Sequence, residues 1–324
     1  MTGSVVSVAL ASYNGERFIA EQLASILAQS RRPDEIVISD GGSGDDTVGI
    51  AREVLKRDAV GISWEIVADG ARLTVGPNFQ RAIARTRGSL IALSDQDDVW
   101  HPDRLARAIV AFEDVDVLLA SSDARLVNEV GSPLPHSLFA ALGLADRDVE
   151  RLLSSDAFTL LIRRNLITGA TVMFRRSLLE AAEPFPADWV HDEWLAIIAS
   201  ALGRLSVERE RLIDYRQHGA NVIGVSAPTF RYRLGRMLES RGGRYEVLAR
   251  RSFELSARLA KVDAPLAWRE LADRKAAFEL VRARYRRVRL ARLVPVLRQL
   301  RAGSYDELSS QGRLDVARDL LQAP

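Results

Sequence analysis

Apolar positions along the first hundred residues form short continuous runs that alternate with helical stripes. The runs predict buried strands at 5–11, 35–39, 63–67 and 90–94. Helical spacing of apolar residues predicts helices at 17–29, 46–56 and 79–84. Strands that alternate with helices predict an α/β fold, with a mostly parallel sheet and helices on both of its faces.

The same pattern continues more weakly up to about residue 226. Further strands are predicted at 116–120, 170–174 and 212–215, and helices are predicted from Pro102 and over 194–202. After Pro228 the chain becomes rich in arginine and helical in pattern. Its apolar stripes are Leu248, Leu255, Leu259 and Val262, then Phe278, Val281, Tyr285 and Val288. We therefore predict an α/β domain at 1–226 and a helical C-terminal extension at 227–324.

Charge is distributed unevenly between these two regions. Thr229–Arg301 holds 20 Lys and Arg against 7 Asp and Glu, a net charge of +13. The whole chain of 324 residues has a net charge of only +2, so the remainder carries −11. The chain has no cysteine, which excludes disulfides and thiolate metal sites. The N-terminus resembles no secretory signal and no run of 18 apolar residues occurs, so a cytoplasmic location is expected.

An acidic loop follows the strand predicted at 90–94. It holds Asp95, Asp97 and Asp98, which repel one another unless a cation joins them. In open α/β sheets ligands bind beyond the carboxyl ends of strands, and hard divalent ions prefer oxygen ligands. The loop therefore predicts a site for Mg²⁺ or Mn²⁺, with a solvated acidic loop as the alternative.

The first two strands end in segments suited to a nucleotide. Ser12-Tyr13-Asn14-Gly15 follows the first strand, and Asp40-Gly41-Gly42-Ser43 follows the second. A tyrosine ring can cover a base, a carboxylate can accept from an imide N–H, and glycines allow close approach. Each segment is weak alone, because it also fits an ordinary turn or a core aromatic. The absence of a Gly-x-Gly-x-x-Gly motif and of a P-loop argues against a dehydrogenase or a P-loop kinase.

Taken in order, these segments resemble glycosyltransferase family 2, the inverting class with a GT-A fold. The resemblance runs from about Val5 to about Gly224 and rests on SVALASYNGERFIAEQLASIL, EIVISDGGSGDDT and GPNFQRAIARTRGSLIALSDQDDVWHPDRL. The later segments ITGATVMFRRSLL, WVHDEWLA and DYRQHGANVIG look most like bacterial rhamnosyltransferase-type enzymes of surface polysaccharide synthesis.

The resemblance implies a role for each matching residue. It places Tyr13 and Asp40 on the pyrimidine base, and Asp95 on the ribose or metal side of the nucleotide. The implied nucleotide-sugar site comprises Ser12, Tyr13, Asn14, Asp40, Gly41, Asp95 and Gln96. Asp97 would ligate Mg²⁺ or Mn²⁺, and His218 would be a late metal or diphosphate ligand.

Asp192 matches the catalytic base of the family. Many members have Glu-Asp at this point, whereas this chain has His191-Asp192-Glu193, so Glu193 stays open as the base. Transfer to a hydroxyl needs a base for the acceptor proton and neutralisation of the leaving diphosphate. The alternatives are an N-cap role for Asp192 and a structural loop role for His218.

Several further residues are candidates for contacts with the acceptor or the donor sugar. These are Trp100, Gly169, Glu193 and Trp194. The tryptophans fit the hydrophobic core equally well, and core is the simpler interpretation of Trp194.

The predicted function is transfer of a sugar from a nucleoside diphosphate sugar, dTDP-rhamnose first and UDP-hexose second, to a saccharide or lipid-linked acceptor. Its rivals are a sugar nucleotidyltransferase and a non-catalytic nucleotide-sugar-binding module. The basic C-terminal region suggests peripheral attachment to the anionic inner face of the plasma membrane. The alternatives for that region are a polyanionic acceptor and a solvated face packed on the acidic domain. The sequence has no nucleic-acid-binding motif, so nucleic acid is not expected as a partner. The oligomeric state does not follow from the sequence.

Overall fold

A nine-stranded sheet forms the centre of the molecule in the computed structural model, which describes residues 4–218, 242–286 and 288–322. The strands are β1 Val6–Ser12, β2 Glu35–Asp40, β3 Ser63–Val67, β4 Leu90–Asp95, β5 Val99–Trp100, β6 Val117–Asn128, β7 Pro133–Ser137, β8 Met173–Arg175 and β9 Arg204–Gln217. Their order is β3-β2-β1-β4-β8-β6-β9-β5, with β7 on the side of β6. The neighbours β1–β2, β2–β3, β1–β4 and β6–β9 are parallel, and the other pairs are antiparallel.

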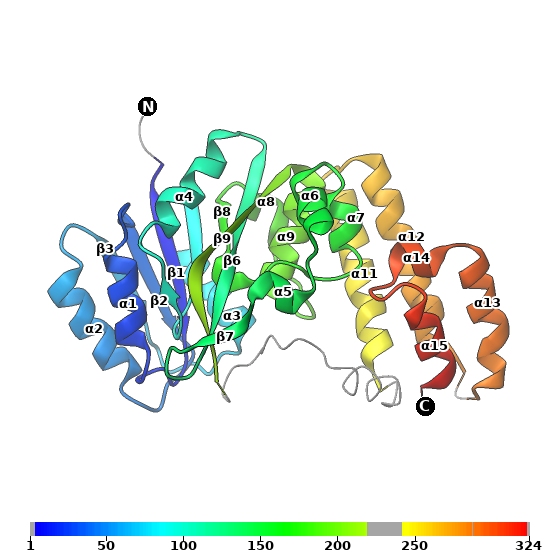
Figure 1. Cartoon of the computed structure of the whole chain (residues 1–324), viewed down its shortest axis with the longest axis horizontal. Helices are drawn as coiled ribbons and strands as arrows, with labels where there is room; N and C mark the ends of the chain where they lie inside the picture. The colour runs from blue at the N-terminus through cyan, green and yellow to red at the C-terminus, as the bar shows by residue number, and fades with distance from the viewer. Residues whose placement is uncertain (1–3, 219–241, 287, 323–324) are drawn as a thin grey trace.

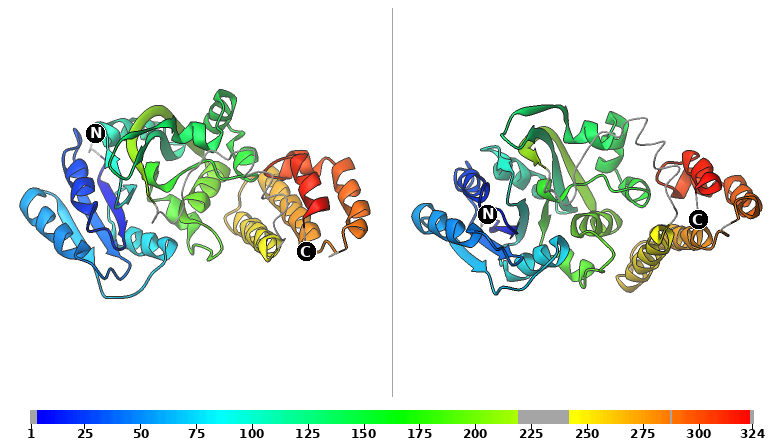
Figure 2. Two further views of the ribbon diagram at one scale, coloured as in Figure 1. Left: turned by 60° about the horizontal axis from the view of Figure 1, so that its bottom comes forward. Right: turned by 90° about the horizontal axis from the view of Figure 1, so that it is seen from below.

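Helices cover both faces of this sheet (Figures 1 and 2). The helices of the first region are α1 Ile19–Leu27, α2 Thr47–Asp58, α3 Val75–Arg85, α4 Arg104–Val110, α5 Leu138–Leu142, α6 Asp146–Leu153, α7 Ala157–Leu161, α8 Leu178–Ala182 and α9 His191–Leu202. Successive side chains of β1 point to opposite faces of the sheet, as in any β-strand. Val8 and Leu10 pack with α1 and α2, whereas Ala9 and Ala11 belong to the core of α3 and α9. The predicted α/β arrangement is confirmed.

Two strands are much longer than the apolar runs predicted. β6 has 12 residues and β9 has 14, and they pair in parallel from Val117 to Asn128. Polar positions such as Ser121 and Ser122 are buried in β6, and the middle of β9 is exposed and charged. Neither stretch has the pattern of a strand, so the long pairing, rather than local propensity, defines these elements.

The C-terminal region is helical, as predicted. It comprises α11 Arg244–Lys261, α12 Leu266–Ala283, the short 3₁₀ helix η3 Leu290–Arg292, α13 Leu293–Arg301, α14 Ser304–Leu308 and α15 Leu314–Leu321. Leu255 and Leu259 of α11 and Phe278 of α12 join the same apolar core as α9. The rings of Phe158 and Trp268 lie 5.1 Å apart across the two regions. The predicted boundary between 226 and 227 lies outside the described residues.

One expectation for this region was wrong in part. Val288 was grouped with an apolar stripe, but it is 64% exposed. The cationic side chains are not all at the surface either, because Lys275, Arg282 and Arg292 are buried. Lys275 Nζ donates to Glu279 at 2.7 Å, and Arg282 Nε donates to Asp319 at 2.8 Å. Buried cations of this kind need such partners, because loss of one partner would leave an uncompensated charge inside the helical region.

Candidate active site

Three parallel strands bring the predicted ligand residues to one edge of the sheet. Ser12 at the end of β1 pairs in register with Asp40 at the end of β2. Ala11 pairs with Asp95 at the end of β4. The structure therefore confirms the expectation that these loops share one edge.

Asp40 organises the loop after β2. Its Oδ1 accepts from the backbone N–H groups of Gly42 and Ser43 at 3.1 and 2.8 Å. Its Oδ2 accepts from the hydroxyls of Ser12 and Ser43 at 2.9 and 2.6 Å. These four bonds occupy the acceptor positions of a carboxylate, and Asp40 is 3% exposed. Asp40 thus shapes the loop after β2, and its contact with a base stays a prediction.

The side chain of Tyr13 stands free at this edge, with 51% of its surface exposed, so it is not a core aromatic. Its backbone is fixed by Gln96, whose amide accepts from Tyr13 N at 2.8 Å and donates to Tyr13 O at 2.9 Å. Asn14 has a φ of 47°, and its Oδ1 accepts from Gly44 N at 2.8 Å. Gln96 and Asn14 therefore hold the loops after β1, β2 and β4 together and present the Tyr13 ring.

Gly41 lies where the backbones approach closely. Its N–H donates to Ser12 O at 2.8 Å, and an added Cβ would lie 3.1 Å from Leu73 O. A glycine at this position therefore lets the β1 and β2 ends and the loop before α3 come together.

The acidic loop after β4 carries more negative charge than its protein neighbours neutralise. Although part of Asp95 stays accessible, burial raises the pKa of its carboxyl to about 8, and the charges of Asp97 and Asp192 add to this. Burial also raises the pKa of Asp98, whose Oδ2 has no hydrogen-bond partner within the described structure. Arg104 opposes these shifts.

The residue Arg104 lies at the start of α4, behind the acidic loop. It is buried, and its Nη2 donates to the carbonyls of Leu93 and Ala170 at 3.2 and 2.8 Å. Burial lowers the pKa of Arg104 to about 9, and the charges of Asp98 and Asp95 act against that shift. The guanidinium also lies 3.5 Å from the centre of the Trp100 ring.

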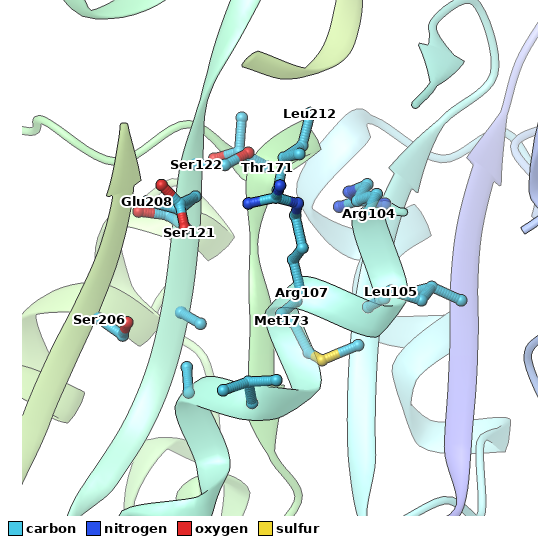
Figure 3. A pocket seen from close by; sticks show the side chains of 15 residues that line it. Arg104, Leu105, Arg107, Ser121, Ser122, Thr171, Met173, Ser206, Glu208 and Leu212 are labelled. Carbon is cyan, nitrogen blue, oxygen red and sulfur yellow. The ribbon is translucent and has the colours of Figure 1, made fainter. Parts of the chain in front are cut away.

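A cavity of about 180 Å³ lies behind Arg104, between α4 and strands β6, β8 and β9. Figure 3 shows Arg104 and Arg107 on one side of it, and Ser121 and Ser122 on the other. The carboxylates of the acidic loop do not line it, so this cavity is separate from the edge that carries the predicted site.

His218 meets the acidic loop from the end of β9. Its Nε2 lies 2.7 Å from Asp97 Oδ2, and its ring stacks on Phe18 with centroids 5.1 Å apart. Arg216 ties the two segments together, because its Nε donates to Asp97 O at 2.8 Å and its N–H donates to Asp98 Oδ1 at 3.0 Å. The two residues predicted as metal ligands are thus brought together from 121 positions apart.

Asp192 approaches the same edge from the other side of the sheet. It belongs to the first turn of α9, with Val190 as the N-cap, so the alternative that Asp192 is the N-cap is wrong. Asp192 Oδ2 accepts from Gly169 N at 2.7 Å, and Oδ1 accepts from Glu193 N at 2.7 Å. Burial raises the pKa of Asp192 to about 6, and these backbone bonds partly oppose it.

Gly169 gives Asp192 its space. A Cβ on Gly169 would lie 3.1 Å from His191 Nε2 and 3.3 Å from Asp192 Oδ2. His191 itself is buried against the ring of Phe79 at 4.1 Å, and burial lowers the pKa of His191 to about 3. A neutral imidazole and a backbone amide therefore flank the carboxylate.

The side chain of Glu193 is engaged elsewhere. Its Oε2 lies 2.5 Å from Arg251 on α11, and the Arg251 guanidinium also covers the Trp189 ring at 4.2 Å. Burial raises the pKa of Glu193, although Arg251 opposes that shift. This pairing favours Asp192 over Glu193 as the free carboxylate.

The two tryptophans proposed as sugar contacts are buried. Trp194 is 0% exposed and its Nε1 donates to Ala182 O at 2.8 Å, while Trp100 is 3% exposed beneath Arg104. A buried indole offers no face to a sugar, so the structure corrects these two hypotheses and assigns both rings to the core.

The acidic edge fits a divalent cation. Asp97 and His218 supply an oxygen and a nitrogen that point at each other, and Asp98 keeps an orphaned buried oxygen. No group of three or more His, Asp or Glu side chains with metal-binding geometry occurs among the described residues. A divalent cation at this edge would therefore have Asp97 and His218 as candidate protein ligands, and diphosphate oxygens would have to complete the set.

Sequence reasoning missed three residues of this site. Arg104 and Arg216 bracket the acidic loop, as described above. Tyr215 was within a quoted motif but had no assigned role. Burial raises the pKa of Tyr215, and the nearby carboxylates of the acidic loop and Asp192 add to that shift. Their position in the sequence could have indicated them. Arg104 begins the helix after the acidic loop, and Tyr215 and Arg216 directly precede the Gln217-His218 segment.

Comparison with solved structures defines the class of this fold. Residues 1–349 of S. aureus TarS, solved with UDP-GlcNAc, superpose with a TM-score of 0.56 at 18% identity, covering 98% of this chain and 90% of that chain. The mannosyltransferase PcManGT from Pyrobaculum calidifontis, solved with GDP-Man and Mn²⁺, gives 0.52 at 19% identity, covering 99% and 85%. At these identities the likeness shows the fold, and the predicted GT-A architecture is confirmed.

The sequence comparisons give the family. The family model described as Glycosyl transferase family 2 matches residues 7–181, which is more than half of the chain. The protein therefore belongs to glycosyltransferase family 2, as the sequence resemblance implied.

Two relatives illustrate the range of this similarity. An uncharacterized glycosyltransferase from Nostoc sp. is 25% identical over 230 residues, which cover 67% of this chain and 66% of the relative. The dTDP-rhamnosyl transferase RfbG of Shigella flexneri is 36% identical over 105 residues, covering 31% of this chain and 35% of that protein. The matched stretches thus span from about a third to just under two thirds of these relatives.

Proposed function

We propose that this protein is an inverting glycosyltransferase that moves a sugar from a nucleoside diphosphate sugar to a saccharide or lipid-linked acceptor. The observation that carries the proposal is the convergence of Asp95, Asp97, Asp192 and His218 at one sheet edge. Structural carboxylates alone have no reason to gather so much unneutralised charge. We favour dTDP-rhamnose as donor, since the Shigella relative is named a dTDP-rhamnosyl transferase. UDP-hexose ranks second, because TarS was solved with UDP-GlcNAc.

In this mechanism Asp192 is the base. As the acceptor oxygen forms its bond to the anomeric carbon, the bond from that carbon to the diphosphate breaks and the acceptor proton passes to Asp192. The N–H groups of Gly169 and Glu193 hold the carboxylate in place. Its raised pKa, about 6, makes it a stronger base than an exposed aspartate while leaving it ionised near neutral pH.

Asp97 and His218 would hold Mg²⁺ or Mn²⁺ on the diphosphate side. When bound, such an ion neutralises the charge that develops on the leaving group. Arg216 keeps the acidic loop and the His218 segment in register, and Phe18 supports the imidazole. The exposed Tyr13 ring would cover the base, with Asp40 beside it, and Asp95 would contact the ribose or metal side of the nucleotide.

The test is transfer and donor hydrolysis across a panel of nucleotide sugars, with and without Mn²⁺. Asp192→Asn should lower kcat by about 10²–10⁴ with little change in donor affinity. Asp97→Asn should abolish metal-dependent nucleotide binding while the fold survives. Glu180→Gln, an exposed carboxylate on α8, is the matched control and should behave as wild type.

Two results would contradict this assignment. Full wild-type activity in excess chelator would remove the metal from the mechanism. A large loss in Glu193→Gln together with an active Asp192→Asn would move the base by one residue. Release of diphosphate from a nucleoside triphosphate and a sugar phosphate would instead identify a nucleotidyltransferase.

A further inference from the structure

The segment formed by η3 and α13 has apolar residues on two opposite sides. On the inner side Val296 is fully buried and Leu300 packs against the core. On the outer side four large apolar residues face solvent. They are Leu290, 78% exposed, Leu293, 41%, Val294, 77%, and Leu297, 38%.

The spacing of these four residues is that of one helical face. Positions 290, 293, 294 and 297 follow the i, i+3, i+4, i+7 pattern that normally faces a core. Single exposed apolar residues are ordinary, but a continuous ridge marks an interaction surface. Figures 1 and 2 place α13 at the end of the molecule opposite α2 and β3, where no described element covers it.

Exposed arginines flank this ridge along the chain. Arg286, Arg289, Arg298 and Arg301 are exposed, and none of them forms an ion pair with a described residue. The buried Arg292 behaves differently, because its Nη1 donates to the carbonyls of Asp319 and Gln322 at 3.2 and 2.8 Å. Arg292 therefore anchors the segment from behind, and the four exposed guanidiniums face outward.

A ridge of this composition selects among partners. A second copy of the chain docked about a twofold axis would bring two copies of the same arginine-rich surface together, and this like charge is unfavourable. A neutral apolar partner would leave the guanidiniums without counter-charges. An anionic bilayer satisfies both features, because leucine and valine enter the boundary between headgroups and acyl chains while arginines bind phosphate.

We propose that the ridge Leu290, Leu293, Val294 and Leu297, with its flanking arginines, is a docking surface for an anionic lipid membrane. No helix among the described residues has the length and apolarity to cross a bilayer. The inference does not depend on the proposed reaction, because it uses neither donor nor acceptor. It also assigns membrane binding to one face of the basic C-terminal region rather than to the region as a whole.

The test is co-sedimentation of the full-length protein with vesicles at low salt. Vesicles of phosphatidylcholine with phosphatidylglycerol should bind it, and pure phosphatidylcholine should not. Binding should weaken as salt rises, because the Debye length is only about 8 Å at physiological ionic strength.

Two variants separate the components of the surface. Leu290→Gln with Val294→Gln should weaken binding on the order of tenfold. Changing Arg286, Arg289, Arg298 and Arg301 to Gln should weaken it on the order of 100-fold or more, and should remove the salt dependence. These side chains are exposed, so the thermal midpoint should stay close to that of wild type.

Matched substitutions on the catalytic domain provide the controls. Val60→Gln with Val115→Gln alters two valines of 76% and 79% exposure, and Arg52, Arg57, Arg72 and Arg147 to Gln removes the same charge from exposed sites. Neither control should change vesicle binding by more than about fivefold, which corresponds to the contribution of one arginine near the membrane surface, about 1 kcal/mol. Equal losses in controls and ridge variants would overturn the proposal. So would equal binding to neutral vesicles, or a concentration-dependent dimer that Val294→Gln abolishes.

Discussion

The carboxylate of Asp192 is set by two opposing influences at the scale of single residues. Burial favours its protonated form, whereas the N–H groups of Gly169 and Glu193 favour its ionised form. Burial has the larger effect, and the pKa rises to about 6. A carboxylate with a raised pKa holds a proton more strongly than an exposed aspartate does. Near neutral pH it is still ionised in most of the protein molecules.

This balance predicts the pH dependence of turnover. A base works only when ionised, so kcat/KM should fall as pH drops below about 6, approaching tenfold per pH unit. A divalent cation on Asp97 and His218 favours ionised neighbours, so raising Mn²⁺ should move this limb to lower pH. The measurement is an initial-rate profile from about pH 5 to pH 8 at fixed ionic strength.

Two variants make the profile specific to this carboxylate. Glu180→Gln should keep the acidic limb unchanged. The residual activity of Asp192→Asn should lack it, since the titrating group is gone. An unchanged limb in Asp192→Asn would assign the titration to another group.

Most of the site residues could be predicted from sequence because they end strands of a parallel sheet. Asp95 and Asp97 follow an apolar run, and their position beyond a strand end is a rule of the fold. The contacts of Arg104 and Arg216 could not be predicted in this way. Each arginine is an ordinary charged residue in the sequence, and only the folded chain shows that it lies buried against the acidic loop.

The same limit applied to Trp194. A tryptophan suits sugar binding as a residue type, but complete burial encloses this indole. The hydrogen bonds that hold Asp40 could likewise not be read from the sequence, because its four protein donors come from the folded loops.

At the scale of elements, the C-terminal helix α11 reaches helix α9, which carries the proposed base. Arg251 pairs with Glu193, the residue that follows Asp192, and Trp189 Nε1 donates to Arg251 O at 3.2 Å. The helical extension thus supports the first turn of α9. We interpret Arg251 as a positioning residue, since it contacts the neighbour of Asp192 rather than the reacting groups.

Arg251→Met should therefore affect both stability and turnover. It leaves Glu193 buried without its cation, which should cost about 3 kcal/mol of unfolding free energy. It should also lower kcat. Donor affinity should stay close to wild type, because the proposed donor residues lie in the loops after β1, β2 and β4 and not on α9. Urea unfolding and nucleotide titration measure the two effects.

A double variant distinguishes lost pairing from lost packing. Adding Glu193→Gln to Arg251→Met removes the unpaired charge and should restore much of the stability. Arg250→Met is the matched control, because Arg250 is 57% exposed and pairs with Asp188 at the surface. A loss in Arg250→Met as large as in Arg251→Met would refute the positioning role.

The strands differ in how well the sequence predicted them. Strands β1, β2 and β4 are buried almost throughout, so their apolar runs predicted them within one or two residues. Strand β3 lies at the edge of the sheet and is only partly buried, yet it was predicted as well. The full lengths of β6 and β9 were not predicted, because Ser121, Ser122 and Asp123 interrupt one run and charged residues fill the other. These two strands depend on each other across the sheet, and local sequence carries little of that information.

At the scale of the whole molecule, the two regions share one core. Ile91 and Leu93 of β4, Leu195 of α9 and Leu259 of α11 belong to the same buried cluster. A chain cut near residue 227 would expose the catalytic side of this cluster. Because the core is continuous, we expect the helical extension and the α/β domain to unfold together.

A single substitution in α11 tests this cooperativity. Leu259 is fully buried, and Leu259→Ala should cost about 2–5 kcal/mol through lost burial and a residual cavity. If the regions unfold as one unit, this loss should lower the urea midpoint of β4 as much as that of α12. Hydrogen exchange followed by mass spectrometry along a urea series reports both segments from the same sample. Leu266→Ala, at a position 63% exposed on α12, is the control and should leave both midpoints close to wild type. A midpoint for β4 that stays fixed while that of α12 falls would show two independent domains, and the continuous core would then contribute little to coupling.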